Sequence, residues 1–213
     1  MKEKNNSILL VEGKDDQHVI WSLLEHYNVP EVFSVIDCDG IENLLRDLSL
    51  RLTTPTMYKC IGVVMDADVN IQSRYDAFCS ILAKTGKYDL VGLSLAENGT
   101  IIKSHDDDYP TFGLWLMPNN RSNGMLEDFV MTLADENDVL MDESDAVLKS
   151  LESRSLNKYA PVHRSKAKIH TYLAWQEEPG KPMGLAITAK VLHAESASAN
   201  VFVEWIKHLF VKA

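Results

Sequence analysis

The first half of the chain alternates short apolar runs with stretches whose apolar residues recur every three or four positions. Short runs of strand-forming residues predict buried β-strands, and the wider spacing predicts amphipathic helices. The predicted strands cover 8–11, 32–36, 61–65 and 112–117. The predicted helices cover about 14–26, 41–48, 71–84 and 125–133. Repeated strand-helix units specify an α/β fold, with a mostly parallel sheet and helices on both of its faces.

The rest of the pattern is less regular. Residues 91–95 and 100–103 are candidates for short strands, and the acidic stretch 104–108 is typical of a solvated loop. After residue 133 the pattern predicts helices over parts of 134–157, over 161–175 and over 200–210, while 184–192 fits a strand or a helix. We therefore expect a core of residues 1–133 and a helical extension of residues 134–213, packed together as one compact domain. Trp175 and Trp205 are expected in its interior.

Composition narrows the class of protein. The 213 residues suffice for one well-buried domain, and 46% hydrophobic with 24% charged residues are ordinary globular values. The net charge of −10 argues against a protein that coats nucleic acid by bulk attraction. Any contact with DNA or RNA must therefore be local, or be assisted by a metal ion or a partner.

The cysteines and the N-terminus bear on the compartment. Cys38, Cys60 and Cys79 form no CxxC pair and are odd in number, which favours a reducing cytoplasm. Residues 1–6 are polar, and the apolar run that follows is too short for a signal segment or a membrane span. We expect a soluble, cytoplasmic protein with no membrane contact.

Acidic residues follow two of the predicted strands directly. Glu12 ends the first strand, and Asp66 and Asp68 come after the strand at 61–65. Because the carboxyl ends of parallel strands share one sheet edge, these side chains are expected to converge, and clustered carboxylates need a cation. Asp16 lies one helical turn after Glu12. Carboxylate oxygens favour Mg²⁺, or Mn²⁺, and two such ions can stabilise both oxygens of a phosphodiester displacement.

Acidic residues near helix starts also have a plain structural explanation. Asp16, Glu127 and Asp128 stand in predicted first helical turns, where the helix dipole favours acids without any ligand. Lys166 shares a helical face with buried positions, so its stem is expected to point inward, whereas Lys168 points away. Further residues at the same predicted sheet edge, which would suit either a tight turn or a phosphate contact, are Gly13, Asp37, Asp39 and Gly40.

The sequence Val11-Glu12-Gly13 after one strand and Asp66-Ala67-Asp68 after another resembles the Toprim domain of topoisomerases, primases and nucleases. The Glu12-x-x-x-Asp16 variant resembles the nucleases of the overcoming-lysogenization-defect (OLD) kind more than the topoisomerases. The resemblance covers about residues 7–130 and implies a Toprim, Rossmann-like fold. It also implies that downstream acids hold a second metal ion and that a lysine assists, and Glu127 and, less closely, Asp128 match those acids by position.

Two later segments add a second resemblance. Residues 124–128 and 167–174 are similar to small stand-alone Toprim-like bacterial proteins of unassigned function. The chain departs from OLD nucleases in having no ATPase domain. Because the protein is net acidic, a partner subunit, an ATPase for example, is expected to help bring the substrate. It departs from topoisomerases in having no nucleophilic tyrosine domain, so supercoil relaxation is not expected.

These patterns favour a Mg²⁺-dependent nuclease acting on DNA or RNA through a two-metal carboxylate site. Glu12 is expected as general base or shared metal ligand, with the remaining roles divided between metal ligands (Asp16, Asp66, Asp68, Glu127 and Asp128) and a charge-stabilising lysine (Lys166 or Lys168). The alternative is a non-catalytic metal-binding, nucleotide-binding or regulatory module that acts with a partner protein. The deficit of positive charge favours the alternative, and the full set of acids favours the enzyme.

Overall fold

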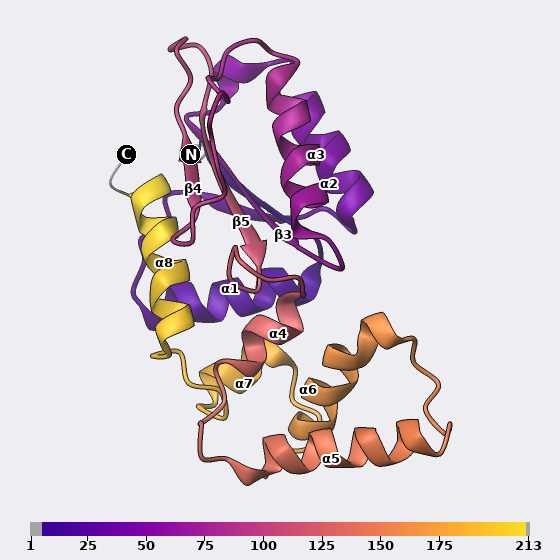
Figure 1. Ribbon diagram of the computed structural model, residues 1–213. Coiled ribbons are helices and arrows are strands. Elements are labelled where there is room, and N and C mark those ends of the chain that lie inside the picture. The colour runs from indigo at the N-terminus through magenta and orange to yellow at the C-terminus, as the bar shows by residue number, and fades with distance from the viewer. Residues whose placement is uncertain (1–5, 212–213) are drawn as a thin grey trace.

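The computed structural model describes residues 6–211 and is built around one five-stranded sheet (Figure 1). The strand order is β2-β1-β3-β5-β4, in which only β4 runs antiparallel to its neighbour. The strands are β1 Ser7–Val11, β2 Ser34–Asp37, β3 Cys60–Asp66, β4 Thr100–Ile102 and β5 Thr111–Met117. The predicted mostly parallel α/β fold is confirmed, although residues 91–95 form no strand. Most of the polar segment 1–6 lies outside the described residues.

Eight α-helices connect or follow the strands of this part of the chain. They are α1 Lys14–His26, α2 Ile41–Arg51, α3 Ile71–Ala83, α4 Leu126–Met131, α5 Val139–Ser153, α6 Arg164–Ala174, α7 Met183–Thr188 and α8 Ala197–Phe210, with short 3₁₀ turns at Pro55–Met57 and Pro161–His163. The segment that fitted a strand or a helix therefore contains a helix, α7. Within residues 6–211, no helix has the length and apolar character needed to cross a bilayer.

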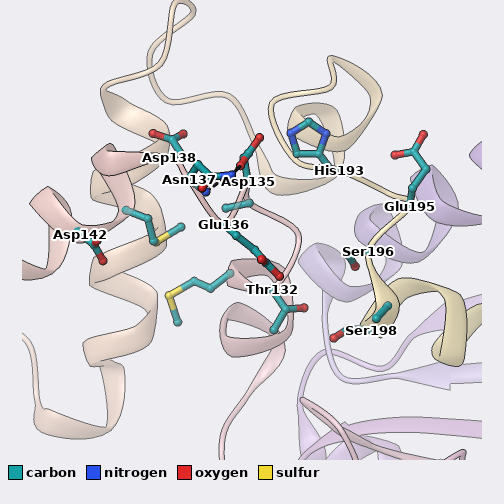
Figure 2. Close-up of a pocket in the computed structure, with 14 residues that line it drawn as sticks. Thr132, Asp135, Glu136, Asn137, Asp138, Asp142, His193, Glu195, Ser196 and Ser198 are labelled. Carbon is teal, nitrogen blue, oxygen red and sulfur yellow. Dashed lines mark hydrogen bonds between the residues drawn. The ribbon is translucent and has the colours of Figure 1, made fainter.

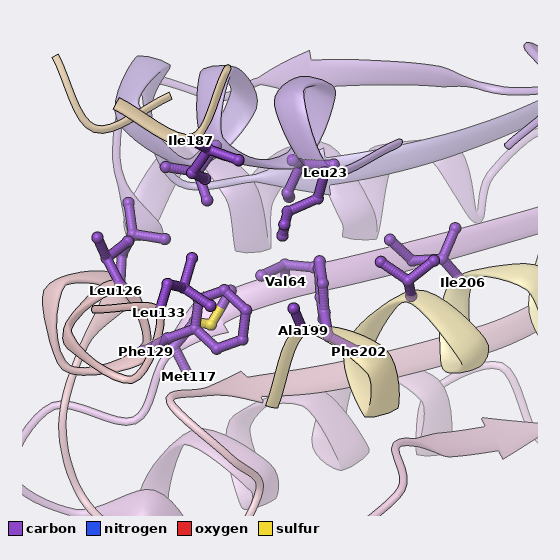
Figure 3. Close-up of a cluster of buried hydrophobic side chains, with 14 of the residues drawn as sticks. Leu23, Val64, Met117, Leu126, Phe129, Leu133, Ile187, Ala199, Phe202 and Ile206 are labelled. Carbon is purple, nitrogen blue, oxygen red and sulfur yellow. The ribbon is translucent and has the colours of Figure 1, made fainter. Parts of the chain in front are cut away.

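Alternating side chains divide the sheet into two buried faces. Ile8 and Leu10 of β1 belong to one apolar cluster and Leu9 and Val11 to the other, as the two-residue period of a strand requires. Helices α2 and α3 cover the first face, and α1 and α8 cover the second. Figure 3 shows the second cluster, where α8 meets side chains of the sheet and of α1, α4 and α7. The helices predicted on both faces are therefore present.

The expected helical extension contributes to the same core. Phe210 of α8 stacks on Phe33 with ring centroids 4.0 Å apart, and Trp205 is buried as predicted. Trp175 is 40% exposed instead, because it follows the last turn of α6 at the surface. Helices α5 and α6 lie beyond the carboxyl ends of the strands (Figure 1), where they extend the edge that carries the acidic residues.

A pair of glycines allows α8 to approach the sheet closely. Gly62 of β3 and Gly113 of β5 are directly paired across the two central strands. A Cβ atom at Gly113 would lie 2.3 Å from Leu209 Cδ2, and one at Gly62 would lie 2.9 Å from Phe210 Cζ. The sheet therefore has no side chains at the point where α8 crosses it, and larger residues there would overpack the interface.

The substitution Gly113→Ala tests this contact. We expect it to destabilise the protein by about 1–3 kcal/mol, because the new methyl group meets buried side chains of α8. Leu209→Ala alone should cost roughly 2–5 kcal/mol. The double variant should be less destabilised than the sum, since the shortened side chain makes room for the methyl group. Urea unfolding measures all three values.

The control for this cycle is Ile206→Ala, which shortens a buried side chain of the same helix that is not among the nearest neighbours of a Cβ atom at Gly113. Its cost should add to that of Gly113→Ala. Strict additivity in the Leu209 cycle would show that the close approach does not limit packing.

Candidate functional site

Four carboxylates from separate parts of the chain meet at the carboxyl edge of the sheet. Glu12 follows β1, Asp16 lies in the first turn of α1, Asp66 ends β3 and Glu127 lies in the first turn of α4. They line one cavity of about 490 Å³ together with Gly13, Lys14, Asp15, Asp37, Asp39, Gly40, Leu126 and Lys166. The predicted convergence of the two strand ends is therefore observed for Glu12 and Asp66.

Backbone hydrogen bonds hold three of these carboxylates in place. The backbone N–H of Asp66 donates to Glu12 Oε1 at 2.8 Å, and that of Leu126 donates to Asp66 Oδ1 at 2.8 Å. The N–H of Gly13 donates to Asp16 Oδ2 at 3.1 Å. Each of the three carboxylates thus uses one oxygen to accept from the backbone.

Asp16 is the most unusual of them. Its side chain is buried, with 7% of the residue exposed, and its second oxygen, Oδ1, has no hydrogen-bond partner. A buried polar atom without a partner costs roughly 1–3 kcal/mol, and more when it is charged. This oxygen therefore needs a proton or a cation in the cavity.

Burial and nearby negative charge raise the pKa values of Glu12, Asp16 and Asp66. Desolvation, followed by the nearby charge of Glu12, raises the pKa of Asp16 to about 7. Desolvation, followed by the charges of Asp16, Glu12 and Glu127, raises the pKa of Asp66 to about 9. The pKa of Glu12 is also raised, mainly by burial. The fully ionised cluster is therefore unstable without added positive charge.

The donor set fits a hard divalent cation. All four side chains offer carboxylate oxygen, which suits Mg²⁺ or Mn²⁺ better than Zn²⁺. Within residues 6–211, no three His, Cys, Asp or Glu side chains are already arranged to hold an ion. The fit consequently rests on the chemistry of the four donors, on their shared cavity and on the unpartnered oxygen of Asp16.

Asp68 lies outside this cavity. The sequence allowed its side chain to point the same way as that of Asp66, but Asp68 adopts a left-handed backbone conformation with φ of 50°. Its backbone N–H donates to the carbonyl of Gly124 at 2.8 Å and its carbonyl accepts from Gly124 at 2.9 Å. The side chain turns toward α3 and forms an ion pair with Arg74.

Asp128 is also directed elsewhere. Its Oδ2 accepts from the backbone N–H of Met125 at 2.9 Å, and its Oδ1 accepts from Ser165 Oγ at 2.6 Å. Asp128 thus caps α4 and joins it to α6, which is the structural explanation weighed above. Together with Asp68 it lines a neighbouring cavity of about 360 Å³.

The two candidate lysines occupy different environments. Lys166 Nζ lies 3.5 Å from Glu127 Oε1 and lines the cavity, whereas Lys168 Nζ lies 3.9 Å from Asp145 of α5, outside it. The prediction that the stem of Lys166 points into the core is wrong, since 51% of its side chain is exposed. Lys166 is the residue of α6 that lines the cavity, and its half-exposed side chain reaches Glu127 from the solvent side.

The residues predicted at the site edge line the cavity as well. Gly40 has a φ of 108°, which favours glycine, and its N–H donates to the carbonyl of Glu12 at 2.7 Å. Asp37 Oδ1 accepts from the backbone N–H of Asp39 at 2.8 Å and so shapes the same turn. Sequence reasoning did not single out Lys14 or Arg74. Arg74 could have been found from its place one turn into the helix that follows Asp68, where it can reach that acid.

A larger cavity, of about 690 Å³, lies between the start of α5 and the segment before α8. Figure 2 shows its polar lining, which includes Asp135, Asp138, His193 and Glu195. None of the acids predicted from the sequence reaches it. We therefore assign the candidate site to the smaller cavity at the sheet edge.

Fold and site together define a Rossmann-like α/β protein with an acidic site at the carboxyl edge of its sheet. Residues 6–211 match the family described as "Protein of unknown function (DUF3226)", and the chain belongs to that family. No curated protein matches the sequence.

Among solved structures, the chain is similar to the C-terminal region of the OLD protein of Xanthomonas campestris pv. campestris. The TM-score is 0.50 and the identity 16%, over 99% of this chain and 98% of that one. This likeness supports the fold.

The elevated pKa values predict how stability depends on pH when metal is removed by a chelator. An acid whose pKa is higher in the folded state binds its proton more tightly there, so stability is present at low pH and falls as pH rises. For Asp16 and Asp66, the fall should extend from about pH 4 to about pH 9. Thermal melts in chelator across this range measure it.

The variant Asp66→Asn keeps the acceptor for Leu126 but removes one charge of the cluster. At pH 8 in chelator we expect its melting temperature to exceed that of the wild type by about 3 °C or more, roughly 1 kcal/mol for a chain of this length. Its pH dependence should be shallower. Equal melts for both proteins at pH 8 would contradict the proposed repulsion.

Proposed function

We propose that this protein is a divalent-cation-dependent nuclease that hydrolyses phosphodiester bonds of DNA or RNA. The observation that carries the proposal is the buried carboxylate cluster around the unpartnered Oδ1 of Asp16. Four acids in one cavity are costly to the fold unless a cation is bound, so the site has a physical need for the ion that such hydrolysis uses. The resemblance of the Glu12 and Asp66 motifs to nucleases of the OLD kind supports the same reaction class, and the fold is similar to that of a region of an OLD protein.

The ion is proposed to be Mg²⁺, with Mn²⁺ as a substitute. Glu12, Asp16, Asp66 and Glu127 would hold it, because among the acids that line the cavity these are the ones that interact by charge with Asp16 or Asp66. When bound, a divalent ion supplies positive charge that stabilises a phosphoryl group and favours ionisation of a nucleophilic water.

The residues of the chain have separate tasks in this proposal. Glu12 is oriented by the backbone N–H of Asp66, and its other oxygen is available to accept a proton from the attacking water. Lys166, beside Glu127 at the solvent side of the cavity, lies where its ammonium group can stabilise charge on a phosphate. Lys168 is occupied near Asp145, so we assign the assisting role to Lys166.

A binding or regulatory module without catalysis is the second candidate. The net charge of −10 favours it, and so does the pairing of nearby arginines with acids, namely Arg74 with Asp68, Arg121 with Glu97 and Arg164 with Asp145. Such a surface attracts a nucleic acid weakly. A partner subunit that supplies positive charge, an ATPase for example, would serve either candidate.

Nuclease assays on Glu12→Gln and Asp66→Asn test the proposal. Each substitution keeps size and hydrogen bonding but removes a charge, so cleavage of plasmid, linear DNA or RNA should fall about a hundredfold or more. The assays should be run in Mg²⁺ and in Mn²⁺, with wild-type protein purified in parallel.

Asp107→Asn serves as the matched control, since Asp107 is an exposed acid of the predicted loop far from the cavity residues in sequence. It should cleave at the wild-type rate. Cleavage that persists in both site variants would indicate a contaminating nuclease. Wild-type protein that binds Mg²⁺ but cleaves nothing with either ion would favour the binding module.

Binding of the ion can be measured without any substrate. Mg²⁺ should raise the melting temperature of the wild-type protein in proportion to the logarithm of its concentration above the dissociation constant. In Asp66→Asn this increase should be smaller by half or more, because one ligand is lost. An unchanged response in the variant would place the ion elsewhere.

A further inference from the structure

Arg74 of α3 is the cation placed against the second aspartate of the Asp66-Ala67-Asp68 motif. Its Nη2 donates to Asp68 Oδ2, and the two side chains are only 26% and 31% exposed. The start of α3 is fixed to the loop after β5, since Asn123 accepts from the N–H of Ile71 at 2.9 Å and donates to the carbonyl of Val69 at 2.7 Å. The backbone at Asp68 and at the start of α3 is therefore tied to the loop after β5, which fixes the position of the ion pair.

The charge of Arg74 also acts on the main cluster. It favours the ionised form of Glu12 and opposes the larger effect of burial, which raises the pKa of that carboxyl. Arg74 thus supplies positive potential to one acid at the end of β1 and to another just beyond β3.

The two neighbouring cavities differ in whether their carboxylates already have partners. In the main cavity, Oδ1 of Asp16 is buried without a partner. In the second cavity, Asp68 is paired with Arg74, and both oxygens of Asp128 accept hydrogen bonds, from Met125 and from Ser165. A cation that binds Asp68 in the second cavity would lie beside the positive charge of Arg74, and one that binds Asp128 would compete with the helix cap.

We propose that Arg74 is a built-in counter-cation for Asp68, so that the protein binds one divalent ion, in the main cavity, and Arg74 takes the place of a second. The inference rests on the proposed function for the identity of the first ion and refines the two-ion expectation from the sequence. Arg74 is then a positioning residue that keeps Asp68 turned away from the ion.

Counting bound ions tests the inference directly. Isothermal titration calorimetry of the full chain with Mn²⁺, checked by the amplitude of the free Mn²⁺ spin-resonance signal, should give one ion per wild-type molecule. Asp68→Asn should also bind one ion, with a dissociation constant changed by less than about threefold, because Asp68 lies outside the main cavity and its charge is already paired with Arg74.

Arg74→Gln should bind a second, weaker ion, since the substitution leaves Asp68 without its partner. Arg74→Lys should restore the count to one, because the positive charge is kept. The double variant Arg74→Gln/Asp68→Asn should also return to one ion. A merely structural role of Arg74 would change the melting temperature but not the ion count.

Arg121→Gln is the matched control, because it breaks an arginine-carboxylate pair with Glu97 that lies outside both cavities. It should leave the count at one. Two ions in the wild-type protein, with one lost in Asp68→Asn, would overturn the inference, and so would a single ion in Arg74→Gln. If Arg74→Gln does not fold, the numbers of ions bound by the wild type, Asp68→Asn and Arg74→Lys test the inference instead.

This outcome is independent of the nuclease assay. One bound ion without cleavage would refute the proposed reaction and leave the role of Arg74 intact. Two bound ions with cleavage would support the proposed reaction and refute the role of Arg74.

Discussion

The mutual repulsion of carboxylates buried at the carboxyl edge of the sheet is the constraint on which the site depends. Parallel strands β1 and β3 bring Glu12 and Asp66 to one edge, and the first turns of α1 and α4 add Asp16 and Glu127. Backbone N–H groups offset part of the cost by donating to three of the acids. They do not reach Oδ1 of Asp16, so the fold retains an electrostatic deficit that a cation would remove.

The fold can tolerate this deficit because the rest of the sheet is densely packed. Helices cover both faces, and the glycine pair on β3 and β5 lets α8 bury Trp205, Leu209 and Phe210 against the strands that end at the site. The final helix, far from the acids in sequence, thereby stabilises the strand that carries Asp66. Rigid strands in turn fix the positions of functional groups more closely than loops can.

Positive charge near the site is arranged in pairs with acids. Arg74 faces Asp68, and Arg164 joins Asp145 and Glu152 across the segment between α5 and α6. Lys14 and Lys166 both line the cavity, and Lys166 lies 3.5 Å from Glu127 Oε1. With a net charge of −10, the protein as a whole repels a polyanion.

The sequence by itself determined the sheet and the place of the site. Apolar runs ending in Glu12 and Asp66 could be recognised because strand and helix periods are local properties of the chain, and parallel strands share their carboxyl edge. Only the tertiary structure decided that the side chains of Asp68, Asp128 and Lys168 lie outside the main cavity. Asp68 pairs with Arg74 and its backbone is bridged to Gly124. Asp128 accepts a hydrogen bond from Ser165, and Lys168 lies near Asp145. Spacing along the chain reports which residues can share an edge, whereas the direction of a side chain depends on backbone dihedrals and on partners that meet only in the folded state.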